Sequence, residues 1–150
     1  MGIKDLEKDR AIEAYKYAYV GKNILNLFQI DNEFYKDDNY KSYVKKIPMM
    51  ILNNGLGATL AFIYSKRKKE NKQKIKAGEK SNPKNAYDLI YIQIDKWLKK
   101  RNIKKSDEEL IKWIINQNSQ EYRAVTNEVL ALFNWLKRFA DGMIEGDDNG

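Results

Sequence analysis

The sequence contains neither cysteine nor histidine among its 150 residues. Without cysteine, the chain has no disulfide framework and no thiol nucleophile. Without histidine, it lacks the most common general base and the most common ligand of zinc and other transition metals. Both absences weigh against catalysis, although enzymes can work without either residue, and we expect no cofactor and no metal.

Long apolar runs are also missing. No window of about eighteen apolar residues occurs, so the sequence predicts no membrane-spanning segment. The first ten residues alternate in charge and have no apolar secretory core, so we expect no signal peptide. A composition of 43% hydrophobic and 33% charged residues is typical of a globular chain. We expect one cytoplasmic domain over residues 1–150, with a frayed acidic tail at 146–150.

Positive charge is concentrated in one place. The net charge is +7, and residues 66–85, with nine Lys or Arg and two Glu, account for the whole excess. A second basic cluster occupies 96–105. Local charge of this kind favours a partner with a phosphate backbone, although a lysine-rich loop can also simply stay solvated. We expect 66–85 to form a basic loop.

Apolar side chains recur at helical spacing along the chain, and no segment makes a credible strand. A helix over 5–29 has one apolar stripe that includes Tyr17 and Ile24. A second stripe, nearly opposite, comprises Ile12, Tyr15 and Tyr19. A helix that is apolar on two sides packs between two bodies, either inside its own domain or between the domain and a partner.

Helix boundary signals divide the rest of the chain. Pro48 is expected in the first turn of a helix that runs to about residue 70 and follows a short helix near 40–46. The helical spacing of apolar residues over 87–98 predicts another helix. The residues from Ser106 to Glu109 match a capping box, which predicts a short helix directly after them.

Asn118 is expected to cap the last helix, whose apolar seam extends over three heptads. We expect this helix to be the central one of the bundle. The predicted fold class is all-α, a single-domain compact bundle of five to six helices.

The stretch NNGLGATLAF, residues 53–62, has two glycines two residues apart. A phosphate-binding loop would need a lysine and a hydroxyl after its last glycine, and Ala-Thr follows Gly57 instead. A dinucleotide fingerprint would need a third glycine at Leu60 and a preceding strand. Both nucleotide interpretations fail. We expect close approach of a neighbouring helix at the glycines, with Gly57 and Ala61 sharing a helix face.

Three stretches together resemble one family. They are YKSYVKKIPMM (40–50), NNGLGATLAFIYSK (53–66) and EYRAVTNEVLALFNWLKRFADGM (121–143). In this order and spacing they are similar to the small helical subunit of the type III-B CRISPR effector, the Cmr or RAMP-module complex. The basic segment 66–85 falls outside them.

The resemblance implies a non-catalytic subunit in antiviral defence. Its copies would stack as an inner filament beside the RAMP backbone subunits and bridge toward the large polymerase-like subunit. A basic surface would line the groove for guide and target RNA. The backbone subunits would cleave the target, and the large subunit would supply cyclic oligoadenylate signalling. No membrane and no small-molecule substrate is implied.

Candidate RNA-binding residues lie mainly on the last helix. At 100° per residue, Arg123, Asn127, Asn134 and Arg138 fall within a wedge of about 60° away from the seam, and the two arginines stand about 22 Å apart along the axis. Arginine forks match phosphate geometry, although these two could instead pair with carboxylates or with a neighbouring subunit. The full candidate set is Arg123, Arg138, Lys137, Lys45, Lys46 and Lys66.

Other interpretations stay open at this point. The aromatic side chains Trp97, Trp113 and Trp135 are expected in the core or in an interface rather than stacked on bases. A second hypothesis is a helical DNA-binding regulator with a helix-turn-helix at 106–129. Against it, the would-be recognition helix has an apolar seam and few base-reading side chains. An enzyme is the weakest alternative, because acidic pairs such as Asp107-Glu108 are explained as charge at a helix N-terminus.

Overall fold

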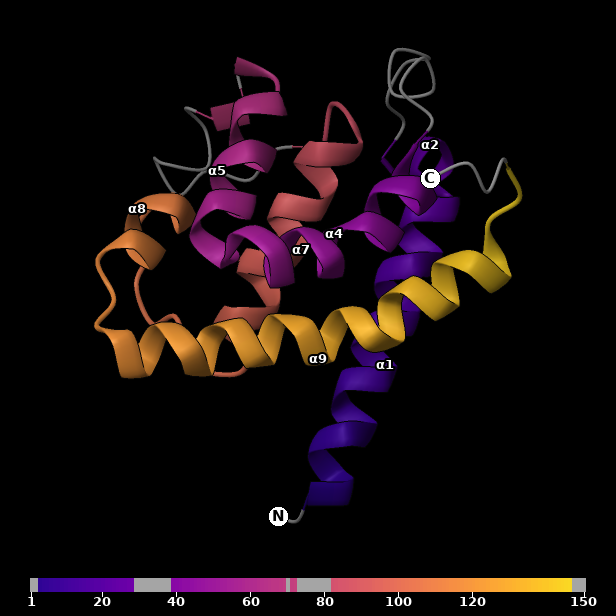
Figure 1. Ribbon diagram of the computed structural model, residues 1–150. Coiled ribbons are helices and arrows are strands. Elements are labelled where there is room, and N and C mark those ends of the chain that lie inside the picture. The colour runs from indigo at the N-terminus through magenta and orange to yellow at the C-terminus, as the bar shows by residue number, and fades with distance from the viewer. Residues whose placement is uncertain (1–2, 29–38, 70, 73–81, 147–150) are drawn as a thin grey trace.

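The computed structural model describes residues 3–28, 39–69, 71–72 and 82–146 (Figure 1). Within these ranges it contains helices and no strand, so the predicted all-α class is confirmed. The helices are α1 (Ile3–Lys22), α2 (Ile24–Phe28), α4 (Tyr40–Asn54), α5 (Leu56–Lys66), α7 (Ala86–Lys100), α8 (Leu110–Ile115) and α9 (Ser119–Met143).

The first predicted helix is interrupted at Asn23. The side-chain amide of Asn23 donates to the carbonyl of Tyr19 at 3.0 Å, and its backbone N–H donates to the same oxygen at 3.0 Å. The backbone N–H of Asn23 is shared with the Val20 carbonyl at 3.2 Å, and asparagine side chains that bond nearby backbone groups are unfavourable inside helices. The prediction of one helix over 5–29 is therefore wrong: two helices, α1 and α2, meet at this residue, and residue 29 lies outside the described ranges.

Pro48 lies inside α4 and does not begin a helix, which corrects the sequence-based expectation. Proline removes one backbone hydrogen bond within a helix, at a cost that tertiary packing must offset. The apolar face of α4 supplies that packing, because Val44, Ile47 and Ile51 are all buried. The chain breaks instead at Gly55, whose φ of 90° is a conformation that glycine adopts readily.

The two glycines serve different purposes. Gly55 separates α4 from α5, whereas Gly57 lies in the first turn of α5 and meets α9. The Gly57 N–H donates to the Tyr122 hydroxyl at 2.7 Å, and a Cβ at this position would lie 3.3 Å from that oxygen. The expected close approach is therefore present at Gly57. Gly57 and Ala61 share a helix face as expected, but the close approach does not extend to Ala61, which is exposed.

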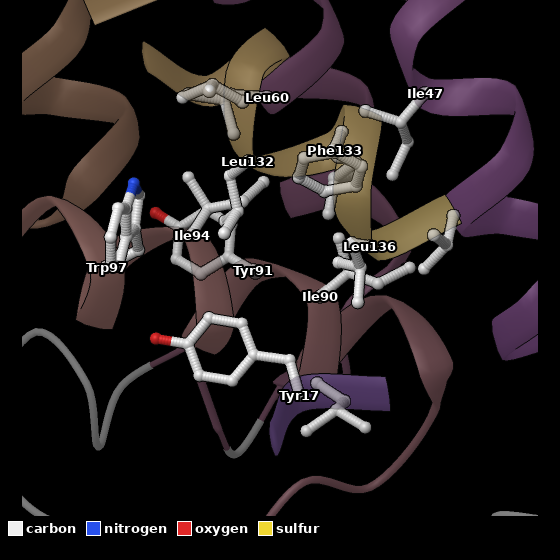
Figure 2. Packing of buried hydrophobic residues seen from close by; sticks show 14 of the residues in the cluster. Tyr17, Ile47, Leu60, Ile90, Tyr91, Ile94, Trp97, Leu132, Phe133 and Leu136 are labelled. Carbon is white, nitrogen blue, oxygen red and sulfur yellow. The ribbon is translucent and has the colours of Figure 1, made fainter. Parts of the chain in front are cut away.

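The most enclosed helix is α7, not α9, so the predicted central helix was wrong. Most residues of α7 are buried, whereas α9 lies along one side of the domain and packs against α1 and α4 (Figure 1). Figure 2 shows how Tyr91, Ile94 and Trp97 of α7 meet apolar side chains of the other helices. The side chains of other helices that are labelled in this view are Tyr17, Ile47, Leu60, Leu132, Phe133 and Leu136.

Helix caps were predicted with mixed success. Asn118 caps α9 as expected, because its side-chain oxygen accepts from the backbone N–H of Glu121 at 2.8 Å. The expected capping box at 106–109 does not form, and α8 begins at Leu110 without a side-chain cap. The reason is that Glu109 is buried and accepts a hydrogen bond from the Tyr91 hydroxyl at 2.5 Å.

Candidate nucleic-acid interface

The outward face of α9 carries four exposed polar side chains. We name this set, Arg123, Asn127, Asn134 and Arg138, the α9 strip; all four are exposed. The opposite face of the helix is buried and includes Val129, Leu132 and Leu136. The amphipathic pattern of α9 thus places the α9 strip on the solvent side of the helix. This agrees with the helical spacing in the sequence, which puts these four residues on one side, away from the apolar seam.

The two arginines of the strip have no carboxylate partner within the described residues. Arg123 makes one local contact, from its Nε to the carbonyl oxygen of Ser119 at 3.4 Å. The ion pairs on α9 involve Glu128 and Asp141 instead. The alternative in which Arg123 and Arg138 pair inside the protein therefore has no support from the described part of the chain.

The lysine candidates differ in their surroundings. Lys45 on α4 lies 3.0 Å from Asp141 on α9, so it helps to join the two helices as well as carrying charge. Lys46 is exposed, and Lys137 is partly buried one turn before Asp141. This places Lys45 and Lys137 at the same end of the contact between α4 and α9, close to the C-terminal end of the α9 strip.

Lys66 is not brought to the α9 strip. It is exposed at the last position of α5, about two and a half turns beyond the contact of Gly57 with α9. Its Nζ lies 5.6 Å from the centre of the Phe62 ring on the same helix. The structure therefore separates Lys66 from the arginines of the α9 strip.

The basic segment 66–85 contains one arginine that is not on the surface. Arg67 is fully buried, its Nε lies 3.0 Å from Asp88 Oδ1, and its guanidinium stands 4.1 Å from the centre of the Tyr91 ring. The second oxygen of Asp88 accepts from the Asn71 amide and from the backbone N–H of Lys84, both at 3.0 Å. Residues 70 and 73–81, which include three of the eight lysines of this segment, lie outside the described ranges.

The second basic cluster, 96–105, is largely engaged in ion pairs within the domain. Lys104 is buried and lies 2.9 Å from Asp95, and Lys100 lies 2.6 Å from the buried Glu13. Burial acts to raise the pKa of Glu13, but hydrogen bonds from Lys100 and Tyr17 outweigh it and leave the pKa below its usual value. Much of this charge therefore stabilises the fold.

An ion pair that sequence analysis missed joins α1 to α9. Arg10 donates to both oxygens of Glu128, at 2.9 and 3.0 Å, and the indole N–H of Trp97 donates to the same carboxylate at 3.1 Å. Glu128 is buried. No local pattern could reveal the pair, because the partners are 118 positions apart in the chain.

A small pocket lies beside this ion pair, between α1 and α9. Its volume is about 150 Å³, and it is lined by Glu7, Ala131, Asn134, Trp135 and Arg138. The indole N–H of Trp135 donates to Glu7 at 3.3 Å across the helix contact. The pocket therefore shares Asn134 and Arg138 with the α9 strip.

The second apolar stripe of α1 is exposed. Ile12, Tyr15 and Tyr19 have 43%, 53% and 50% of their surface accessible. The helix is thus apolar on two sides, as predicted. The second side is only partly covered within the described structure, where the Tyr15 ring meets the edge of the Phe139 ring on α9 with their centres 5.5 Å apart. Exposed apolar side chains that gather on one helix face are typical of surfaces that contact other proteins.

The described ranges hold neither a membrane-spanning helix nor an acidic metal-binding cluster. No helix there is long and apolar enough to cross a membrane. No group of three or more acidic side chains in these ranges is placed to hold a metal ion.

The fold and the surface define a class of protein: a small all-α domain with an outward cationic strip and an exposed apolar helix face, suited to binding other macromolecules. A family model described as CRISPR-associated protein (Cas_Cmr5) matches residues 6–143. The chain therefore belongs to the Cas_Cmr5 family of CRISPR-associated proteins, the small subunits of the Cmr complex. The resemblance found in the sequence is confirmed, and the family favours it over the DNA-binding regulator with a helix-turn-helix at 106–129.

Proposed function

We propose that the protein is the non-catalytic small subunit of a type III-B CRISPR-Cas effector and acts in antiviral defence in the cytoplasm. Its copies stack as an inner filament beside the RAMP backbone subunits and reach the large polymerase-like subunit. It lines the groove for guide and target RNA through phosphate contacts that do not read sequence. It uses no cofactor, metal or small-molecule substrate.

The observation that supports this proposal most strongly is the α9 strip. Arg123 and Arg138 present their guanidinium groups on one exposed helix face, and the two residues are about 22 Å apart along the helix axis. Such a spacing suits two phosphates that are several nucleotides apart on an extended strand. Guanidinium groups bind phosphate without reading the base, so the guide RNA would supply all sequence recognition.

The exposed apolar face of α1 supports the structural half of the proposal. A subunit of a filament needs contact surfaces for its neighbours, and the core of such a surface contains aromatic and aliphatic side chains. Tyr15 and Tyr19 are amphipathic anchors of the kind that is enriched at protein interfaces. The α1 face and the α9 strip have no residue in common, although Tyr15 of the α1 face packs against Phe139 of α9. The proposal assigns the first surface to protein contacts and the second to RNA.

The RNA contact is tested by fluorescence anisotropy of the purified protein with single-stranded RNA across a range of salt concentrations. We expect log affinity to fall linearly against log salt, with a slope of about −0.7 for each phosphate contacted. The double variant Arg123→Gln and Arg138→Gln should weaken binding, flatten this slope and leave the melting temperature close to that of the parent. A strongly sequence-selective or salt-independent affinity would contradict the proposal.

A matched control separates the α9 strip from net charge. Lys22, at the end of α1, and Lys112, on α8, are exposed lysines outside the strip. The double variant Lys22→Gln and Lys112→Gln removes the same amount of charge. Equal weakening by the two double variants would show that binding depends on overall charge, and the strip would then lose its assigned role.

A further inference from the structure

We infer that the pocket between α1 and α9 binds one unstacked nucleobase of a single-stranded RNA whose phosphates follow the α9 strip. This inference rests on the proposed function, since it requires RNA on the strip, and it adds a contact to the base that phosphate binding alone does not include. The pocket and the strip are continuous, because Asn134 and Arg138 belong to both.

The chemistry of the lining suits a flat, neutral group. Trp135 provides an aromatic surface, Asn134 provides both a donor and an acceptor, and Arg138 provides donors for carbonyl oxygens and ring nitrogens. Stacking of a base on an aromatic side chain tolerates any sequence, because every base has a π-face. The Glu7 carboxylate lines the pocket, and its negative charge disfavours a phosphate there. The phosphates are therefore expected to bind along the α9 strip outside the pocket.

The aromatic wall is held in place before any ligand arrives. The Trp135 ring lies nearly parallel to that of Phe139, at 21° and 6.1 Å between centres, and its N–H donates to Glu7. Glu7 in turn pairs with Arg10, the residue that binds Glu128. A side chain fixed in this way loses little freedom on binding, which favours affinity.

The pocket exists because residue 131 is small. Side chains on a helix lean toward its N-terminus, so Trp135 reaches back over the preceding turn, where Ala131 lies, and Arg138 reaches back toward Asn134. A leucine at 131 would occupy this space without removing a charge or a helix former. Ala124, an exposed alanine two turns earlier on α9, offers a matched control for the same substitution.

The test compares an oligouridylate of about ten nucleotides with an abasic oligomer of the same length and charge. The unmodified protein should bind the oligouridylate about tenfold more tightly, since one stacked base contributes on this scale. Ala131→Leu should abolish this preference and keep the salt slope, while Ala124→Leu should change neither. The comparison of oligomers uses the unmodified protein, so it does not depend on how a variant folds.

The outcomes separate the two proposals. Equal, salt-dependent binding of both oligomers would overturn the base pocket and leave the phosphate contact intact, whereas salt-independent binding would overturn the phosphate contact itself. A base preference that persists in folded Ala131→Leu would place the base elsewhere and also overturn the pocket. If Ala131→Leu instead lost only its co-purifying RAMP subunits, the pocket would hold a protein side chain and the inference would be wrong.

Discussion

Arg10 and Glu128 form a two-point ion pair between the first and the last long helix. The Nε and Nη2 atoms of Arg10 donate to the two carboxylate oxygens at 2.9 and 3.0 Å. The hydrogen bond to Glu128 outweighs partial burial and raises the pKa of Arg10 above its ordinary value. Trp97 of α7 donates to the same carboxylate, so one acidic side chain joins three helices.

Removal of this carboxylate should destabilise the domain substantially. Glu128→Ala leaves the Arg10 guanidinium without its main partner, and breaking a buried pair typically costs about 3 kcal/mol or more. We expect the free energy of unfolding, measured by urea denaturation, to fall by about that amount. Glu121→Ala, on the exposed face of the same helix, should cost less than about 1 kcal/mol. Similar losses for both variants would contradict the structural role assigned to Glu128.

Two glycine substitutions should change stability in opposite directions. Gly55 adopts a φ of 90°, where an alanine side chain is strained, so Gly55→Ala should lower the free energy of unfolding by about 1–2 kcal/mol. Gly142 is exposed in α9, with nothing within 4 Å of an added Cβ, so Gly142→Ala should raise it by up to about 1 kcal/mol. Thermal melts of the two variants check the signs, and a stabilised Gly55→Ala would refute the helix break.

Stability should fall in alkaline solution. Burial raises the pKa of Tyr17, Tyr40 and Tyr91 above the ordinary value of 10.0. The folded state keeps these hydroxyls protonated, while the unfolded state releases their protons above about pH 10. The stabilisation is therefore complete below that pH and is lost as the pH rises, at up to about 1.4 kcal/mol per pH unit for each tyrosine.

A tyrosine variant tests the cause of the alkaline loss. Tyr40→Phe removes one titrating group, together with its hydrogen bond to Gln93 at 2.6 Å. It should be less stable by about 1 kcal/mol at neutral pH and should lose stability less steeply above about pH 10. Urea titrations at several pH values measure both effects. An unchanged dependence on pH would show that this tyrosine does not contribute.

The exposed face of α1 should be needed for assembly rather than for folding. Ile12→Ser together with Tyr19→Ser removes two half-exposed apolar side chains, so the melting temperature should change little. Co-purification with tagged RAMP backbone subunits should drop severalfold. Ile115→Ser, at a residue on α8 that is 65% exposed, serves as the control. Unchanged assembly of the α1 variant would remove this face from the subunit contacts.

Local patterns predicted what depends on local physics. The period of 87–98 predicted α7, Asn118 predicted the start of α9, and the wedge on α9 predicted which polar residues are exposed. The errors arise where a distant partner overrides a local signal. Pro48 was expected to begin a helix. It lies inside α4 instead, because the packing of the buried face of α4 offsets the cost of a proline within the helix. Glu109 was expected to complete a capping box with Ser106, but its buried carboxylate accepts a hydrogen bond from Tyr91 instead.

Charge was the least predictable property of the candidate site. Arg67 stands in a run of lysines and resembles any other surface cation, yet it is fully buried against Asp88, 21 positions further along the chain. Lys104 is buried in the same way. The sequence gives the sign of each charge, and only the fold shows which charges are neutralised inside the protein. The sequence already favoured the arginines of the α9 strip over the lysine clusters, but only the ion pairs show that part of the lysine charge is neutralised within the domain.

The contacts of Asp88 have a consequence for how this chain can vary. The carboxylate binds Arg67, Asn71 and the backbone of Lys84, so both ends of the basic segment are tied to one buried point on α7. A connection whose ends are fixed can gain length at small entropic cost, about 0.6 kcal/mol for each doubling. Insertions or fused tags between the two attachment points should therefore leave the helical body unchanged, which makes this segment a natural site for grafting a label.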